Sequence, residues 1–165
     1  MSELLKQLTS LKGIPGNEKQ VRLFFEEQVK EYGELTHDQL GSAIVEKVGL
    51  PDGPRIMVAG HMDEIGFIVT EITKDGYVKF IPNGGWWGHV VLSQQFTITT
   101  RAKGEVHAVV GSKPPHILGA EERNKVVDLK DMYLDLGVAN KEEALALGVQ
   151  VGDMVTPFID FRRMG

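Results

Sequence analysis

An apolar run that stops at two polar residues is the feature that most constrains how this chain can fold. Residues 56–59 are hydrophobic, and Gly60 then precedes His61 and Asp63. A short apolar run rich in branched side chains predicts a buried β-strand. Because α/β enzymes place their chemistry at the ends of such strands, the run predicts an α/β layer with a candidate site at its end.

The spacing of His61 and Asp63 suits a metal ligand and the group that orients it. In an extended backbone, side chains two residues apart point to the same side, so the Asp63 carboxylate can accept the proton of one imidazole nitrogen. The other nitrogen is then free to bind a metal. A solvated polar turn explains these two residues about equally well, because a single His-x-Asp pattern has low specificity.

Composition narrows the class of protein. A chain of 165 residues that is 42% hydrophobic can form one ordinary domain or two small ones. The net charge of −5 without a basic block argues against nucleic acid, and the lack of a signal-like start or a long apolar run argues against a membrane. The absence of cysteine excludes disulfides and zinc–thiolate sites and indicates a reducing cytoplasm. Any metal would be held by His and carboxylates.

The pattern along the chain changes near residue 66. Before it, helical spacing at residues 4–11 and 17–33 is followed by three short strand patterns, the last of which is the run that ends at Gly60. After it, short strands separated by turns predict a small barrel or sandwich, at residues 68–70, 77–81, 96–100, 106–110, 132–136 and 153–159. A capping-box-like start at Asn140 predicts one short helix through Leu147, closed by Gly148.

The predicted α/β piece has too few helices and strands to form a complete layer. Two helices and three strands cannot cover both faces of a sheet that has a buried central strand. We therefore expect either that the chain is part of a longer one or that a partner covers the open face.

Several other residues are candidates for a site or for packing. His89 and His116 lie in loops, and the paired prolines before His116 stiffen its loop and aim it. His37 and His107 lie within strand patterns, where structural roles are expected. The pair Trp86 and Trp87 suits a specificity pocket, barrel packing or a subunit contact.

Four blocks of sequence together resemble a known family. They are GHMDEIGF at residues 60–67, GGW at 84–86, GSKPPH at 111–116 and ALALGVQVGD at 144–153. In this order they look like the first half of a glutamyl-aminopeptidase or tetrahedral-aminopeptidase family member. Members of that family are cytoplasmic dinuclear metallo-aminopeptidases of prokaryotes that assemble into large oligomers.

The resemblance implies an α/β fold class with a partial aminopeptidase-type catalytic domain. Residues 1–66 would be the N-terminal part of that domain, residues 67–158 an inserted β-rich, protease-associated-like barrel that dimerises, and residues 159–165 the return to the rest of the catalytic domain. It also implies that His61 ligates one metal and that Asp63 has the catalytic role of orienting it. A complete site would hold two divalent ions, zinc or cobalt, and act on a peptide substrate in a homo-oligomer.

The chain departs from the family pattern in one respect. The bridging Asp, the adjacent Glu pair and the remaining ligands follow the inserted domain in the family, whereas this sequence stops where the catalytic domain would resume. We therefore expect the N-terminal half of an aminopeptidase that is inactive alone, in which His116 helps to shape a substrate pocket or a partner's site. The alternative is a non-catalytic dimerisation or assembly module.

Overall fold

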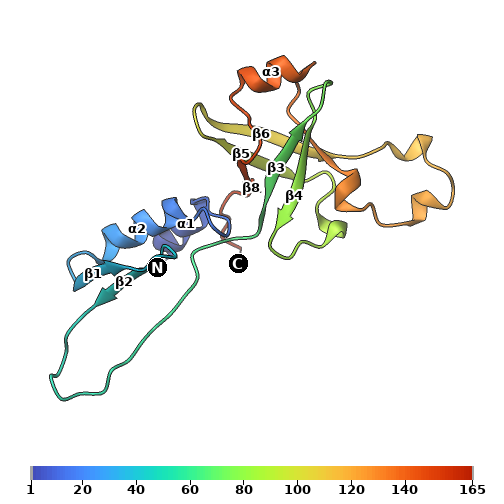
Figure 1. Ribbon diagram of the computed structural model, residues 1–165. Coiled ribbons are helices and arrows are strands. Elements are labelled where there is room, and N and C mark those ends of the chain that lie inside the picture. The colour runs from blue at the N-terminus through green and yellow to red at the C-terminus, as the bar shows by residue number, and fades with distance from the viewer. Residues whose placement is uncertain (1, 165) are drawn as a thin grey trace. The chain divides into compact units, whose positions relative to one another are not determined.

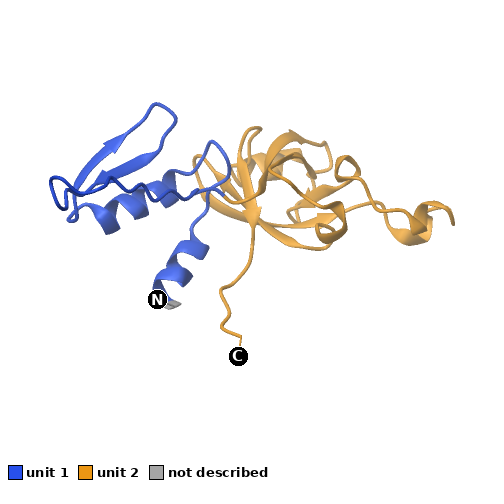
Figure 2. Cartoon of the chain, turned by 90° about the horizontal axis from the view of Figure 1, so that it is seen from below, with its two compact units in different colours: residues 1–63 blue, residues 64–165 orange. Residues whose placement is uncertain are grey.

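The chain divides into two compact units, residues 1–63 and residues 64–165 (Figure 2). The computed structural model describes residues 2–164. The first unit contains two helices and a β-hairpin, and the second is built on a closed β-barrel. Within residues 2–164, none of the helices has both the length and the hydropathy that crossing a lipid bilayer requires.

Two helices open the first unit, α1 at Ser2–Ser10 and α2 at Lys19–Val29 (Figure 1). Both were predicted from the helical spacing of their apolar residues. Their packing is shallow: Ile14, which lies between them in the sequence, is the one hydrophobic residue among residues 2–63 that is fully buried. This unit therefore has little hydrophobic core of its own. The small number of helices and strands expected for it predicts this result.

A two-stranded antiparallel hairpin completes the regular structure of the first unit. It joins β1 at Glu34–His37 to β2 at Ala43–Glu46, in a register that pairs Glu34 with Glu46. The turn is held by Asp38, whose carboxylate accepts the backbone N–H groups of Leu40 and Ser42 at 2.9 and 2.8 Å. Hydrogen bonds from Ser42 are the main reason why the pKa of Asp38 lies below its ordinary value.

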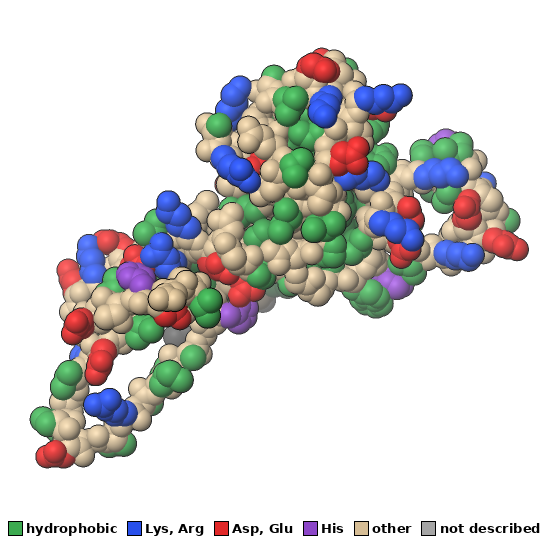
Figure 3. All heavy atoms as spheres, viewed as in Figure 1, with side chains coloured by type: hydrophobic (Ala, Val, Ile, Leu, Met, Phe, Trp, Pro, Cys, Tyr) green, Lys and Arg blue, Asp and Glu red, His purple; other side chains and the backbone are tan. Residues whose placement is uncertain are grey.

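The strand predicted from the apolar run at residues 56–59 is wrong. Residues 54–65 carry no helix or strand, and Met57 and Val58 are 90% and 92% exposed. Figure 3 shows hydrophobic side chains spaced along this bare segment, which is the long loop between β2 and β3 in Figure 1. A buried strand needs neighbours that pair with its backbone and cover its faces, and the described residues supply neither to this run.

The second unit contains a closed six-stranded antiparallel barrel, one of the two architectures that the strand spacing predicts. Around the barrel the strands follow the order β3-β4-β7-β6-β5-β8. Their bounds are Gly66–Ile72 (β3), Val78–Asn83 (β4), Gln95–Thr100 (β5), Gly104–Gly111 (β6), Tyr133–Asp135 (β7) and Met154–Pro157 (β8). The last strand pairs with both β3 and β5, so it closes the barrel.

Aromatic rings form the centre of the barrel core. Phe67 is fully buried, and its ring centroid lies 4.5 Å from that of Phe80, 4.8 Å from that of Trp86 and 5.2 Å from that of Phe96. The Trp86 indole also donates a hydrogen bond of 2.8 Å to the carbonyl of Gly66. Three roles were considered for the Trp86–Trp87 pair. Trp86 performs one of them, which is packing of the barrel.

The short helix predicted after Asn140 is present as α3, at Lys141–Ala146. The Asn140 side chain accepts the backbone N–H of Glu143 at 2.9 Å, and the Glu143 carboxylate accepts the backbone N–H of Ala139 at 2.9 Å. The first bond satisfies an N–H of the first helical turn that has no partner within the helix, and the second holds the residue before the N-cap. Gly148, at φ +94°, ends the helix in the left-handed conformation that glycine adopts without strain.

A long excursion leaves the barrel between β6 and β7. It contains three 3₁₀ turns, η2 at Pro115–Ile117, η3 at Glu122–Asn124 and η4 at Leu129–Asp131, and Figure 1 shows it reaching away from the barrel. Its returning end is held by Lys79, whose ammonium donates to the carbonyl of Met132 at 3.1 Å. A fourth turn, η1 at Gly88–Val90, lies in the loop after β4.

Candidate metal-binding site

The candidate ligand and its orienting carboxylate lie together in the irregular segment before the barrel. The Nδ1 atom of His61 is 2.9 Å from the backbone carbonyl oxygen of Asp63 and 3.2 Å from its Oδ1. The contact that the two-residue spacing predicts is therefore present, although the segment is not a strand. The His61 side chain is 83% exposed and that of Asp63 is 33% exposed.

This geometry determines which imidazole nitrogen can act as a ligand. Both hydrogen bonds that the described residues make to the His61 ring are at Nδ1, and both partners are acceptors. A neutral ring therefore carries its proton on Nδ1, which leaves the lone pair on Nε2 for a metal. The pair thus fits the role of one metal ligand held by a carboxylate.

One imidazole does not make a complete metal centre. Residues 2–164 contain no group of three or more His, Asp or Glu side chains arranged to hold a metal ion. A hydrolytic zinc site uses three protein ligands and an open position for water. His61 and Asp63 would therefore supply only one corner of such a site.

The other candidate histidines have separate surroundings. His116 is exposed in η2 on the excursion, and His89 is exposed in η1 with its ring 4.4 Å from that of Trp87. Both lie in the second unit, whereas His61 lies in the first. His107 is exposed on β6, where its ring centroid is 4.7 Å from that of Phe158.

His37 has the structural role expected for it. Its Nε2 lies 2.8 Å from a carboxylate oxygen of Glu26, which also forms an ion pair with Arg22. The network ties α2 to β1. The hydrogen bond from His37 is the largest reason why the pKa of Glu26 lies below its ordinary value, and the Arg22 guanidinium adds to it.

One buried acid was not foreseen. The Asp153 side chain has no exposed surface, and although its Oδ2 accepts the backbone N–H of Gln150 at 2.8 Å, its Oδ1 has no hydrogen-bond partner among the described residues. Burial raises the pKa of Asp153 above its ordinary value. In the sequence, an Asp at the start of a strand carries no sign of burial, so no pattern marks it.

Comparison with known proteins identifies the family. A family model described as M42 glutamyl aminopeptidase matches residues 41–165, which is most of the chain and includes His61 and Asp63. The chain belongs to the M42 glutamyl aminopeptidase family. A second model, described as AMPT, matches residues 1–25. The M42 assignment confirms the resemblance seen in the four sequence blocks.

Relatives with names or structures support the assignment. The glutamyl aminopeptidase of Lactococcus lactis is 36% identical over 156 residues, which are 93% of this chain and 44% of that enzyme. A TET aminopeptidase from a marine sediment archaeon of the Thaumarchaeota is 43% identical with a TM-score of 0.94, over 99% of this chain and 45% of that one. The TET1 peptidase of Pyrococcus horikoshii, which can assemble into a tetrahedron or a large octahedral shell, is 33% identical with a TM-score of 0.80, over 94% of this chain and 46% of that one.

These matches confirm the predicted fold class, an α/β aminopeptidase-type domain represented in part and carrying an inserted β-rich barrel. The chain spans slightly less than half the length of the M42 relatives it matches.

Proposed function

We propose that this chain is the N-terminal portion of a metal-dependent aminopeptidase that releases N-terminal residues from peptides. The observation that carries the proposal is the His61–Asp63 pair, which has the geometry of an oriented metal ligand and lies within the region that matches the M42 family. His61 would bind one of two divalent ions, zinc or cobalt, through Nε2. Asp63 would take its catalytic role by holding the ring and raising the basicity of that nitrogen.

The metals would supply Lewis-acid chemistry and an activated water. The contribution of this chain would be to present the His61 imidazole with Nε2 free, because its described residues contain no group of three or more side chains that could hold a metal ion. The remaining ligands would come from residues outside this sequence. The 165-residue chain alone is therefore expected to be inactive.

A chimera tests this proposal. Residues 1–165 would replace the matching 45% of the Thaumarchaeota TET aminopeptidase, with which the chain aligns almost completely. Hydrolysis of aminoacyl-4-nitroanilides with added zinc or cobalt is expected from the chimera and is expected to be lost in His61→Ala. Turnover by the pure 165-residue chain, or full activity of the chimera carrying His61→Ala, would contradict the proposal.

The barrel is proposed to mediate assembly. We assign residues 67–158 as the dimerisation domain and residues 159–165 as the return to the catalytic domain. Support comes from the TET1 relative, which can assemble into a tetrahedron or a large octahedral shell, and from the hydrophobic core that the barrel unit has of its own. His116, exposed on the excursion, would help to shape a substrate pocket with a neighbouring subunit. The cysteine-free sequence suits the cytoplasm as the proposed location.

The second candidate function is a non-catalytic assembly module. It is favoured by the uneven burial, because nearly all the buried hydrophobic residues belong to the second unit. The same chimera distinguishes the two: an assembly module would give a folded oligomer that never turns over substrate, whatever metal is added.

A further inference from the structure

The turn between α1 and α2 has a well-defined conformation. The backbone N–H of Asn17 donates to the carbonyl of Ile14 at 2.8 Å, and Pro15 and Gly16 occupy the two central positions. Gly16 has φ +86°, so the turn has the proline and the left-handed glycine that a type II turn favours. The N–H of Gly16 also donates to the Glu18 carboxylate at 2.6 Å. Neighbouring residues therefore hold this turn in one shape.

The start of this turn is the most buried part of the first unit. Among residues 3–63, the two that are fully buried are Gly13 and Ile14. A Cβ added at Gly13 would lie 3.3 Å from the Cα of Glu18, 3.3 Å from the Cγ2 of Val21 and 3.6 Å from the carbonyl oxygen of Met62. The space beside Gly13 is therefore filled by the start of α2 and by the backbone of Met62.

The Met62 carbonyl belongs to the backbone that joins His61 to Asp63. Burial begins here, because residues 54–61 are exposed whereas Met62 and Asp63 are partly buried. The His61 ring depends on this backbone, since its Nδ1 lies 2.9 Å from the carbonyl oxygen of Asp63 as well as 3.2 Å from its Oδ1. A shift of the backbone at Met62 would therefore move an acceptor of the Nδ1 proton even if the Asp63 side chain were intact.

We propose that Gly13 is a positioning residue for His61. The absence of a side chain at Gly13 lets the turn support the Met62 carbonyl, and this support keeps the two acceptors of Asp63 where they hold the Nδ1 proton. The inference rests on the proposed role of His61 as a metal ligand, because a proton on Nδ1 is what leaves Nε2 free for a metal. It deepens that role by assigning the orientation of the ligand in part to the turn between α1 and α2.

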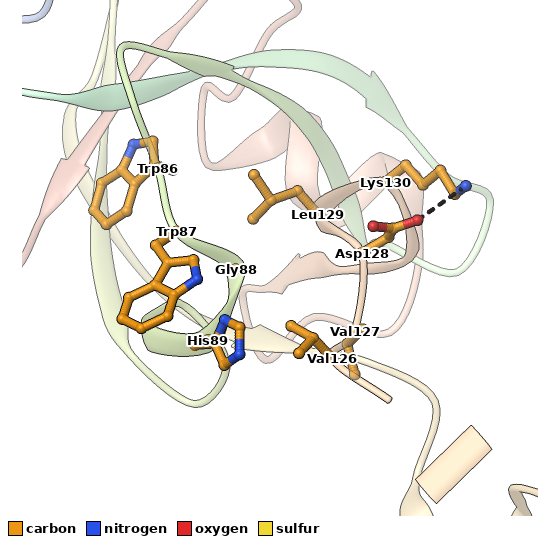
Figure 4. A pocket seen from close by; sticks show the side chains of 9 residues that line it. All are labelled: Trp86, Trp87, Gly88, His89, Val126, Val127, Asp128, Leu129 and Lys130. Carbon is orange, nitrogen blue, oxygen red and sulfur yellow. Dashed lines mark ion pairs between the residues drawn. The ribbon is translucent and has the colours of Figure 1, made fainter. Parts of the chain in front are cut away.

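The end of the bare segment that joins the barrel is held separately. Trp86, which lines a hollow of the second unit (Figure 4), donates a hydrogen bond of 2.8 Å to the carbonyl of Gly66 at the start of β3. Both residues belong to the second unit, whereas His61 belongs to the first. Trp86→Phe removes this donor and keeps an aromatic ring, so it tests whether the barrel side also orients His61.

Heteronuclear NMR of the histidine rings measures the tautomer of His61 in the 165-residue chain, at a pH where the ring is neutral. The wild type should carry its proton on Nδ1, and His61→Gln assigns the resonances by their loss. Gly13→Val, whose methyl groups extend beyond Cβ, should displace the Met62 carbonyl and shift His61 toward a mixture of the two tautomers. Gly13→Ala should have a smaller effect in the same direction, because its Cβ only reaches contact with that carbonyl.

The matched control is Gly49→Val, since a Cβ at Gly49 would meet nothing within 4 Å. Gly49→Val and Trp86→Phe should both leave the tautomer of His61 as it is in the wild type. Circular dichroism checks that α1 and α2 remain helical in each variant. If Gly13→Val loses its helices, the shift in Gly13→Ala decides the test.

Zinc affinity in the chimera gives a second readout. Gly13→Val is expected to weaken zinc binding by about 10-fold, the lower end of the effect of losing a group that orients a ligating histidine. Gly49→Val and Trp86→Phe should bind zinc as tightly as the parent chimera. Competition with a chelator measures each affinity.

The outcomes separate this inference from the function it rests on. A chimera that binds zinc equally well with His61→Ala would overturn the proposed metal ligand, and the role of Gly13 with it. Loss of zinc in His61→Ala, together with an unchanged tautomer and affinity in the Gly13 variants, would overturn the role of Gly13 alone. A tautomer shift in Trp86→Phe as large as that in Gly13→Val would also overturn it, because the ring would then be oriented from the barrel.

Discussion

The Nε atom of Arg101 lies 3.7 Å from the Oδ1 atom of Asp153. At this distance the guanidinium attracts the carboxylate but is too far away to donate a hydrogen bond to it. Arg101 crosses the turn at Gly152, where a Cβ would meet its Nη2 at 2.7 Å and where φ is +90°. Arg101 is largely exposed, so its charge is screened by solvent and offsets only part of the cost of burying Asp153.

We predict that Asp153 makes the barrel more stable in mild acid. Its folded pKa is raised, so the folded barrel binds a proton more readily than the unfolded chain does. The contribution of Asp153 to the free energy of unfolding therefore grows as the pH falls through the folded pKa, and levels off below the ordinary value of 3.8. Asp153→Asn should remove this dependence. Both tryptophans lie in the barrel unit, so urea unfolding followed by tryptophan fluorescence measures this dependence. An unchanged pH slope in the variant would refute the prediction.

The first unit should respond to acid in the opposite direction. The folded pKa of Glu26 is lowered by the hydrogen bond from His37, so the stability that this carboxylate contributes is present above pH 4.5 and is lost as the pH falls below it. Glu26→Gln should remove that acid transition, as measured by the helical circular dichroism signal, which comes mostly from α1 and α2. Glu27→Gln, on the same helix but well exposed, is the matched control and should titrate like the wild type.

The aromatic centre of the barrel should dominate its stability. Phe67→Ala is expected to reduce the free energy of unfolding by about 3–5 kcal/mol, because it leaves a cavity among three other rings. Ile81→Ala, at a half-exposed position on β4, should cost no more than about 0.5 kcal/mol. Urea titrations followed by tryptophan fluorescence give both values. Equal losses in the two variants would show that the core is not centred on Phe67.

Asp63 should affect metal binding through His61. In the chimera described above, Asp63→Asn is expected to weaken zinc affinity by about 10–100-fold, the usual effect of losing the carboxylate that orients a ligating histidine. Competition with a chelator measures the affinity. Asp52→Asn, in the exposed turn before the bare segment, is the control and should bind as tightly as the parent chimera. An Asp63→Asn variant with unchanged affinity would remove Asp63 from the site.

Local sequence patterns predicted the parts of the structure that are held by interactions between residues close in sequence. Short strand patterns separated by turn signals predicted the barrel strands, and Asn140 and Glu143 predicted the start of α3. The His61–Asp63 contact was predictable for the same reason, because the two residues are neighbours in sequence and need only a short extended backbone. In each case the interaction that decides the structure is formed within a few residues.

The failures have a shared physical origin in long-range packing. Ile56, Met57 and Val58 have the composition of a buried strand, but a strand also needs partners, and those are not specified by the run itself. The burial of Asp153 depends on how β8 packs between β3 and β5, which the residues around it do not encode. The position of β7 between β4 and β6 is equally non-local, since the 112–131 excursion precedes it in the chain.

Closure of the barrel by β8 has a topological consequence. The antiparallel pairing of Phe67 with Val155 puts the first residues of β3 beside the last residues of β8, so the chain enters and leaves the barrel at one point on its rim. A domain whose two ends lie side by side can be inserted into a host fold, or removed from it, without forcing the two flanking segments apart.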